Sequence, residues 1–501
     1  MRSRTAASPR SAGWRRPGPA RRSDAAGHTV APGFIDIHSH SDLTLLLDPR
    51  AVSAIAQGVT TEVIGNCGHG CAPILDPALA KTAIYGPVAN LNFGWRGVAG
   101  YLKRLERARP AVNVAALVPN GQLRLGTVGT AERAARPDEL ARMTRALTKS
   151  LEQGAFGFST GLEYGHEASA SEEEVTALCR VVARAGGLYA THTRERDSRA
   201  PEAVAEALRT ARDAGVRLQV SHITPRAGRD VTEHCLELVD QARRDGQDVA
   251  FDMHTRLFGF THLKNLLPSW ALEGTPDAIA TRLRDPAIRD QFRAHPNLIS
   301  GIGDWERVIL LNCPRFPGLA GLSLAEIGRR RSKPPLDAAY DILSLEPDNL
   351  LLPMVILKSY SEDLLRLTYR EPDCMVGSDA TTLAPDGPLA AEIFHGAYTW
   401  AAWFYRRIVR ELGDLTPAEA VERLAALPAR VLGLSDRGTL TQGARADIVV
   451  FDPERFGERG TVEQPNRLAE GMIHVVVNGT PTLVDGAPTG QRNGHVLRAR
   501  R

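Results

Sequence analysis

A chain of 501 residues is long enough for one large domain with insertions, or for a large domain beside a small one. Its hydrophobic fraction of 43% and charged fraction of 24% are typical of a soluble globular protein, and its net charge of +3 argues against a broad nucleic-acid surface. No run of about 18 apolar residues indicates a membrane span. We expect a small molecule, and neither nucleic acid nor a membrane, as partner; the oligomeric state stays open.

The N-terminal composition and the spacing of the cysteines indicate the cellular compartment of the protein. Residues 1–23 are rich in Arg, Pro and Ala and lack the apolar core of a secretion signal, so a disordered basic tail is predicted. The six cysteines are scattered rather than spaced as a disulfide framework. Together these features favour a cytoplasmic protein.

Eight short β-type runs, most of them ending in polar residues, recur along residues 24–432. Helical patterns lie between many of them, for example at 138–154 and 171–187, where a Ser-x-x-Glu capping box opens the second and paired glycines end it. This alternation predicts an α/β fold, a closed (β/α)8 TIM barrel rather than an open doubly wound sheet. The runs are 33–38, 60–66, 112–118, 155–160, 188–192, 217–222, 248–254 and 374–379.

Two segments fall outside this alternation. Roughly 120 residues separate the seventh strand from the eighth, far more than an ordinary loop, so a helical insertion at 257–369 is predicted over the barrel mouth. From residue 433 onward, alternating β-patterns such as MIHVVVNGTPTLVDG (472–486) occur without helices. Residues 433–501 are therefore predicted to form a small C-terminal β-sandwich segment.

Side chains that can bind a metal stand at the ends of five of the predicted strands, where functional residues of a TIM barrel lie. His38 and His40 end the first strand, and their spacing of two points both into the barrel. The second, fifth, sixth and eighth strands end in Cys67, His192, His222 and Asp379. Imidazole, thiolate and carboxylate together favour zinc among the common divalent ions.

Each of these residues taken alone also has an ordinary explanation. A buried cysteine is usually a small apolar residue, and a rim histidine often only makes hydrogen bonds. Cys71 is spaced from Cys67 as in a zinc loop, but no second such pair exists, which disfavours a zinc ribbon. His254 ends the seventh strand and is a candidate substrate contact. No chemistry is assigned to the histidines in helices, loops or terminal strands: His166, His234, His262, His295 and His474.

These residues, in this order, resemble the amidohydrolase superfamily and, within it, the D-aminoacylase (N-acyl-D-amino-acid deacylase) family. The similarity extends from about residue 24 to the end. Its most specific part is GNCG combined with His-x-His, because most relatives bridge their metals with a lysine carbamate. The matching stretches are VAPGFIDIHSHSD (30–42), GVTTEVIGNCG (58–68), GAFGFSTGLEY (154–164), GGLYATHTR (186–194), AGVRLQVSH (214–222), MVGSDA (375–380) and DRGTLTQGARADIVVFDP (436–453).

The resemblance implies a zinc-dependent hydrolase that cleaves the linear amide of N-acyl-D-amino acids to a carboxylate and a free D-amino acid. Asp379 would be its general base and acid, Tyr164 would contact the substrate, and the insertion would act as a lid. The implied ligands are Cys67, His192 and His222 for a tight zinc site, and His38 and His40, bridged by Cys67, for a weaker second site.

Three stretches depart from the family pattern around the substrate. After the sixth strand, Thr224 replaces a substrate-binding lysine; after the seventh, MHTR (253–256) replaces a Tyr-Pro-Tyr-like element. In the third-strand motif, a His-Gly pair appears as Asn120-Gly121. The sequence therefore predicts neither the preferred acyl group nor the preferred D-side chain of the substrate. Our hypothesis for the cation that binds the substrate carboxylate is Arg256, with Lys264 and Arg194 as rivals and a rim salt bridge as the ordinary alternative.

The resemblance also suggests two alternatives to the deacylase activity. Family members begin with several β-strands that complete the C-terminal sandwich, whereas this chain has a basic stretch before Asp24. We therefore expect that the N-terminal half of the sandwich is missing through a truncated or misassigned start, and a catalytically inactive product is one alternative. Another amidohydrolase reaction, that of a cyclic amidase such as a hydantoinase or of a dipeptidase, is the other.

Overall fold

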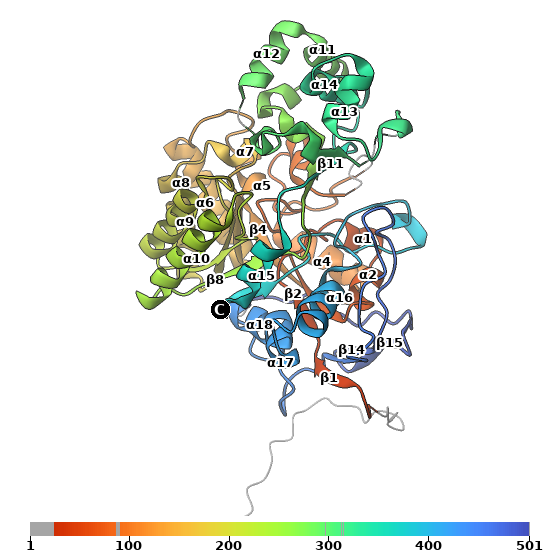
Figure 1. Ribbon diagram of the computed structural model, residues 1–501. Coiled ribbons are helices and arrows are strands. Elements are labelled where there is room, and N and C mark those ends of the chain that lie inside the picture. Colours follow the sequence, from red (N-terminus) through yellow and green to blue (C-terminus); the bar gives the residue numbers. More distant parts are fainter. Residues whose placement is uncertain (1–24, 87–90, 296, 312, 314, 500–501) are drawn as a thin grey trace, which may run out of the picture.

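The computed structural model describes residues 25–86, 91–295, 297–311, 313 and 315–499, so the tail predicted at 1–23 lies outside the described residues. A barrel occupies the middle of the molecule, with a mainly helical segment at one end and a small sheet at the other (Figure 1). No helix among the described residues is both long enough and apolar enough to cross a bilayer.

Eight parallel strands form the predicted barrel, and each pairs with its neighbours in chain order from β2 to β12. Nearly every strand residue is buried, as expected for strands enclosed between outer helices and a packed interior. Each strand lies within a few residues of its predicted run. The strands are β2 (Phe34–Asp36), β3 (Val59–Ile64), β4 (Asn113–Pro119), β5 (Gly157–Gly161), β6 (Leu188–His192), β7 (Arg217–Val220), β8 (Val249–Met253) and β12 (Cys374–Val376).

The first and last barrel strands meet just beyond their C-terminal ends. A parallel bridge joins Ser39 to Ala380. Beside it, the Asp379 backbone N–H donates to the His38 carbonyl at 2.8 Å, and the His40 N–H donates to the Ala380 carbonyl at 2.8 Å. The seam of the barrel therefore runs through three of the predicted site residues and fixes their backbones relative to one another.

Helices cover the outside of the barrel (Figure 1). The helices predicted at 138–154 and 171–187 are α6 (Pro137–Glu152) and α8 (Glu172–Arg184). The other long outer helices are α4 (Val98–Ala108), α9 (Ala200–Ala214), α10 (Arg229–Arg244) and α15 (Glu362–Arg370). Shorter helices lie in the loops and after β12: α1 (Thr44–Leu47), α2 (Val52–Ile55), α3 (Pro77–Ala80), α5 (Asn120–Leu125), α7 (Gly165–Ala168), α16 (Trp400–Phe404), α17 (Pro417–Val421) and α18 (Leu427–Leu432).

Only half of the capping box predicted for α8 forms. Ser171 Oγ accepts the Glu174 backbone N–H at 3.2 Å, as expected. The Glu174 carboxylate does not return to the helix terminus, because it binds the guanidinium of the buried Arg124. Leaving the buried Arg124 cation without a partner would cost more free energy than leaving one N–H at the start of α8 uncapped. The Glu174 carboxylate therefore pairs with Arg124.

The insertion predicted between the seventh and eighth strands is folded. Its antiparallel sheet joins β10 (Val308–Leu310), β11 (Met354–Leu357) and β9 (Gly259–His262). Four helices lie beyond this sheet (Figure 1): α11 (Pro276–Arg284), α12 (Pro286–Ala294), α13 (Leu324–Arg331) and α14 (Pro335–Leu345). The apolar core of the insertion extends to Cys67 and Tyr164, so it reaches the barrel mouth. Helix α15, inside the predicted range, packs against α10 and β12 as part of the outer layer.

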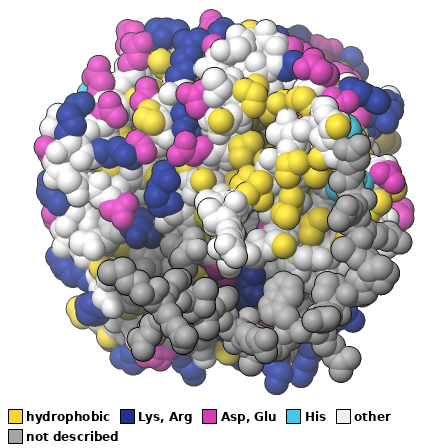
Figure 2. Space-filling view, turned by 90° about the horizontal axis from the view of Figure 1, so that it is seen from below, with side chains coloured by type: hydrophobic (Ala, Val, Ile, Leu, Met, Phe, Trp, Pro, Cys, Tyr) yellow, Lys and Arg dark blue, Asp and Glu magenta, His cyan; other side chains and the backbone are white. Residues whose placement is uncertain are grey.

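The predicted β-rich C-terminal region forms a five-stranded antiparallel sheet that also takes in β1 from before the barrel. Its strands are β1 (Thr29–Pro32), β13 (Ile448–Phe451), β14 (Met472–Val477), β15 (Thr480–Val484) and β16 (Ala487–Pro488). One face packs on the barrel, where Phe451 contacts Phe34 at a ring distance of 6.3 Å. Figure 2 shows this end of the molecule, where apolar side chains gather beside charged ones.

Asp447, just before β13, ties this sheet to the barrel. Its buried carboxylate accepts from Arg437 Nη1 at 2.7 Å, from Asn113 Nδ2 on β4 at 3.1 Å, and from the Asn478 N–H at 2.7 Å. Asp447→Ala is expected to lower the free energy of unfolding in urea by about 3 kcal/mol, because the buried Arg437 loses its main counter-ion. The control is Asp436→Ala, a partly exposed carboxylate whose loss should cost below about 1 kcal/mol. Equal losses for the two variants would contradict this assignment.

Candidate metal centre

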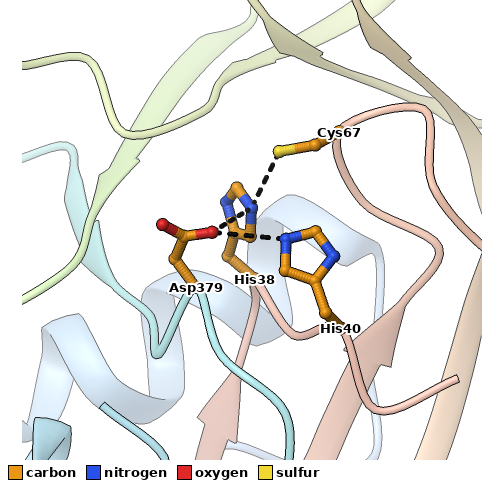
Figure 3. A group of neighbouring side chains, drawn as sticks. All are labelled: His38, His40, Cys67 and Asp379. Atoms are coloured by element: carbon orange, nitrogen blue, oxygen red, sulfur yellow. Dashed lines mark hydrogen bonds and ion pairs between the residues drawn. The ribbon is translucent and has the colours of Figure 1, made fainter. Parts of the chain in front are cut away.

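The six predicted rim residues converge at the C-terminal end of the barrel. They follow or end β2, β3, β6, β7 and β12, strands that carry their ends to one rim. Figure 3 shows four of them pointing toward one another: His38 and His40 from the segment after β2, Cys67 from the one after β3 and Asp379 from the one after β12. All five of the Cys and His side chains in the set are buried.

The ligand-type atoms form two groups that share one sulfur. Within each group they lie within 4.8 Å of one another. Cys67 Sγ is 3.1 Å from His38 Nε2 in the first group and 3.5 Å from His222 Nε2 in the second. A thiolate in this place can bridge two ions or serve either one. The groups are His38, His40, Cys67 and Asp379, and Cys67, His192 and His222.

Three of the six residues have a left-handed backbone conformation. The φ angles are 52° at Cys67, 36° at His222 and 42° at Asp379. This region is unfavourable for side chains with a Cβ and is concentrated at functional sites. Each of the three residues lies two or three positions after a strand, where the chain turns back over the barrel end and carries the side chain into the centre.

Burial controls the protonation of the second group. It lowers the pKa of His192 to about 4 and holds that of His222 well below the ordinary value, so both rings are neutral at pH 7. His192 Nδ1 and His222 Nε2 face each other at 3.1 Å. Burial also raises the pKa of the Cys67 thiol. Two neutral imidazole nitrogens beside a sulfur, in a buried site, form a donor set that fits a soft or borderline divalent cation.

Two carboxylates orient two of the histidine rings, each from the side of the ring that faces away from the centre. His38 Nδ1 is 2.9 Å from Asp252 Oδ1, and His192 Nε2 is 2.7 Å from Glu163 Oε2. In both rings the other nitrogen faces the centre, so the carboxylate fixes the tautomer that leaves a lone pair pointing inward. Asp252 also accepts the His222 backbone N–H at 3.0 Å. Neither carboxylate was among the predicted residues, although Asp252 lies on β8 two positions before the predicted site residue His254.

A histidine and an arginine hold the Asp379 carboxylate. Its Oδ1 is 3.2 Å from His40 Nε2, and its Oδ2 accepts from Arg256 Nη2 at 2.6 Å. Burial alone would raise the pKa of Asp379, but the Arg256 guanidinium and the His40 hydrogen bond hold that pKa well below its ordinary value. The carboxylate is therefore ionised, and it belongs to the first group of ligand-type atoms.

The predicted substrate contacts lie around the same centre. The Tyr164 ring is buried 4.7 Å from the His192 ring, and the His254 ring is 6.5 Å from that of His222. Arg256 also donates through Nη1 to the carbonyls of Ser378 and His395. Its role as the partner of the substrate carboxylate stays a prediction, and the ion pair with Asp379 weighs against it.

The two rivals of Arg256 differ in their surroundings. Arg194 is paired with Glu206 at 2.8 Å and donates to two carbonyls, so its charge is already neutralised. Lys264 is buried, and its Nζ donates to the Thr82 carbonyl at 3.3 Å. Aromatic rings to which no chemistry was assigned continue the site toward this lysine: His69, Tyr85, His166 and His262.

Comparison with known proteins gives consistent matches. The profile of the amidohydrolase family matches residues 22–284 and 371–483. An N-acyl-D-glutamate deacylase of Alcaligenes xylosoxydans xylosoxydans is 34% identical over 95% of this chain and 88% of its own length. Among solved structures, the N-acyl-D-glutamate deacylase of Bordetella bronchiseptica, complexed with zinc and a phosphonate inhibitor, superposes with a TM-score of 0.76 at 32% identity, covering 95% of this chain and 90% of that one. A D-aminoacylase with a binuclear metal centre gives a TM-score of 0.77 at 30% identity with the same coverage.

Proposed function

The chain belongs to the amidohydrolase family, in its D-aminoacylase branch, and we propose that it hydrolyses N-acyl-D-amino acids with the help of zinc. Water adds to the carbonyl carbon of the linear amide, and the carbon–nitrogen bond breaks. The products are a carboxylic acid and a free D-amino acid. The six free cysteines support a cytoplasmic location as part of the same proposal.

One observation carries the proposal: a single buried sulfur, Cys67 Sγ, belongs to both groups of ligand-type atoms. Cys67, His192 and His222 would hold one zinc ion, and His38 and His40 would hold a second with Cys67 as the bridge. Sulfur and imidazole ligands suit zinc; the similar deacylase of Bordetella bronchiseptica is complexed with zinc, and a similar D-aminoacylase has a binuclear metal centre. When bound, zinc would supply a Lewis acid for the amide carbonyl and for the attacking water.

Asp379 is the residue that moves the proton. Its ionised carboxylate would accept a proton from the attacking water and return it to the nitrogen of the leaving amine. Arg256 keeps this carboxylate ionised and oriented through the 2.6 Å contact, and His40 holds the other oxygen. A carboxylate that is ionised and fixed before substrate arrives needs no reorganisation during the reaction.

Tyr164, His254 and the insertion would enclose the substrate. Tyr164 shares an apolar cluster with Cys67 and with the core of the insertion, which places a water-excluding wall against the centre. His254 stands beside Asp379, with Nε2 3.9 Å from Oδ2. The insertion would act as the lid.

The test is zinc content together with activity scored by enantiomer. Protein reconstituted with zinc should hydrolyse N-acetyl-D-amino acids at least about 100-fold faster, as kcat/KM, than their L-enantiomers; this ratio corresponds to about 2.7 kcal/mol between the transition states. Amine release and metal analysis measure both properties. Removal of zinc by a chelator should abolish activity, and readdition should restore it.

Hydantoins and dipeptides complete the panel. Hydrolysis of hydantoins without hydrolysis of N-acetyl-D-amino acids would replace the proposal by a cyclic amidase. Protein that is folded but binds no zinc and is inactive on the whole panel would overturn it in favour of an inactive product.

A further inference from the structure

Glu167 is a buried carboxylate that the proposed mechanism does not use. It lies in the short helix α7, and its side chain is fully buried. Its Oε2 accepts the Gly161 backbone N–H at 3.0 Å and Asn120 Nδ2 at 2.8 Å. Asn120 is the residue that departs from the family pattern, in which a histidine stands at this position. The departure therefore places an amide donor against Glu167.

The other oxygen of this carboxylate lies against the loop that carries Cys67. A methyl group at Gly68 would lie 1.7 Å from Glu167 Oε1, so the carboxylate packs directly on the Gly68 backbone. Gly68 also has a φ of 70°, in the left-handed region that favours glycine. Oε1 itself has no hydrogen-bond partner among the described residues. Close packing, and not a hydrogen bond, therefore joins Oε1 to this loop.

The same loop is held by two neighbours of Glu167. The Gly121 N–H donates to the Gly68 carbonyl at 3.1 Å. A methyl group at Gly161 would lie 2.2 Å from the Cys67 carbonyl oxygen, so the Gly161 backbone packs on Cys67 while Glu167 holds its N–H. One carboxylate therefore supports the backbone on both sides of the Cys67–Gly68 peptide.

Glu167 also closes the turn that presents Tyr164. Its backbone N–H donates to the Tyr164 carbonyl at 2.8 Å, and the Tyr164 N–H donates to the Gly161 carbonyl at 3.0 Å. Because the Glu167 side chain binds the Gly161 N–H, this residue contacts both ends of the turn. The proposed metal ligand Cys67 and the proposed substrate contact Tyr164 are therefore supported by one side chain.

Stability alone does not account for a carboxyl group in this place. Burial raises the pKa of Glu167 to about 7, although the hydrogen bonds from Asn120 and Gly161 lower it. An unpartnered buried oxygen adds to the unfavourable free energy. Cys67 has a left-handed φ of 52°, and such a conformation persists only where surrounding contacts hold it. The contacts of Glu167 supply part of that support.

We propose that Glu167 is a positioning residue, which holds Cys67 in the orientation that binds metal and fixes the turn of Tyr164 beside it. The inference rests on the proposed function, because it assigns a support to one of the proposed zinc ligands. Loss of a side chain that orients a metal ligand lowers metal affinity or activity by about 10- to 100-fold.

Metal affinity and the spectrum of the cobalt-substituted protein test this role. Glu167→Ala should bind Zn²⁺ and Co²⁺ about 10- to 100-fold more weakly in competition with a chelator. The near-ultraviolet charge-transfer band that a thiolate gives to bound Co²⁺ should weaken, because the Cys67 sulfur is no longer held. Glu167→Gln keeps the shape and an oxygen for the Gly161 N–H, so it should restore most of the affinity and of the band. KM for N-acetyl-D-amino acids should rise in Glu167→Ala through the displaced Tyr164.

Two variants separate this role from a general effect on folding. Asp447→Ala removes a buried acceptor beside the start of β4, so it should lower Tm and leave both the metal affinity and the cobalt band unchanged. If Glu167→Ala does not fold, Asn120→Ala decides the question, because it removes one donor to Oε2 and should weaken metal binding ~5-fold.

The possible outcomes distinguish this inference from the proposed function. Wild-type affinity and an unchanged band in folded Glu167→Ala would overturn the inference, as would a Glu167→Gln protein that binds metal no better than Glu167→Ala. Unchanged affinity in Asn120→Ala would do the same where Glu167→Ala does not fold. Wild-type protein that shows the thiolate band but hydrolyses no N-acetyl-D-amino acid would overturn the proposed function and spare this inference. Wild-type protein that binds neither ion would remove both.

Discussion

Cys67→Ala is expected to lower kcat/KM on N-acetyl-D-amino acids at least ~1,000-fold and to reduce the zinc content of the purified protein. Cys67 supplies the sulfur that both ligand groups share, 3.1 Å from His38 Nε2 and 3.5 Å from His222 Nε2. Its removal leaves two imidazoles and a carboxylate in the first group and only two imidazoles in the second. Loss of a Lewis acid costs several kcal/mol at the transition state, and about 4 kcal/mol is a factor of 1,000 in rate.

Cys71→Ala is the matched control for this prediction. Cys71 is as deeply buried as Cys67 and four residues away, but its sulfur belongs to neither ligand group. This variant should keep its zinc and most of its activity, with a loss of stability of roughly 1–2 kcal/mol from the small cavity. Equal zinc content in the two variants after exhaustive dialysis would remove Cys67 from the metal site.

The barrel and its rim were predictable because both depend on local pattern. Each barrel strand is a short apolar run, and the parallel arrangement carries all the C-terminal ends to one edge. Positions such as His192 therefore become neighbours of His38 as soon as the order of the strands is known. The left-handed φ angles at Cys67, His222 and Asp379 were not predictable, because none of these three residues is itself a glycine.

The contacts that tune the centre join residues far apart in the chain. Arg256 lies 123 positions from Asp379, and nothing in the local sequence of either residue indicates their ion pair. Glu163 follows its strand, outside the alternating pattern, and its bond to His192 exists only because β5 and β6 are neighbours. Asp252 was the one partner that the sequence could have indicated, since it lies two positions before His254 in the same predicted run. Sequence patterns located the candidate ligands that the structure brings together, whereas the partners that orient them depend on packing.

Asp379→Asn is expected to lower kcat by about 1,000-fold while KM and zinc content change little. The substitution keeps the shape of the side chain but removes its capacity to accept a proton, and general acid–base catalysis contributes roughly 100- to 10,000-fold. The three proposed ligands of the other group, Cys67, His192 and His222, are untouched, so zinc should remain bound there. Steady-state kinetics and metal analysis on the same preparation measure both effects.

A fall in activity could also follow from the charge left on Arg256, because its guanidinium loses the carboxylate 2.6 Å away and stays buried. An unpaired buried arginine costs about 3 kcal/mol of stability, which would appear as a lower Tm. Asp386→Asn, whose side chain is 69% exposed against Arg50, gives the control for loss of a carboxylate and should alter neither Tm nor kcat appreciably. Since a loss of stability lowers the amount of folded enzyme and not its kcat, kcat per bound zinc separates the two causes. An Asp379→Asn enzyme with kcat per zinc within tenfold of wild type would show that another group moves the proton.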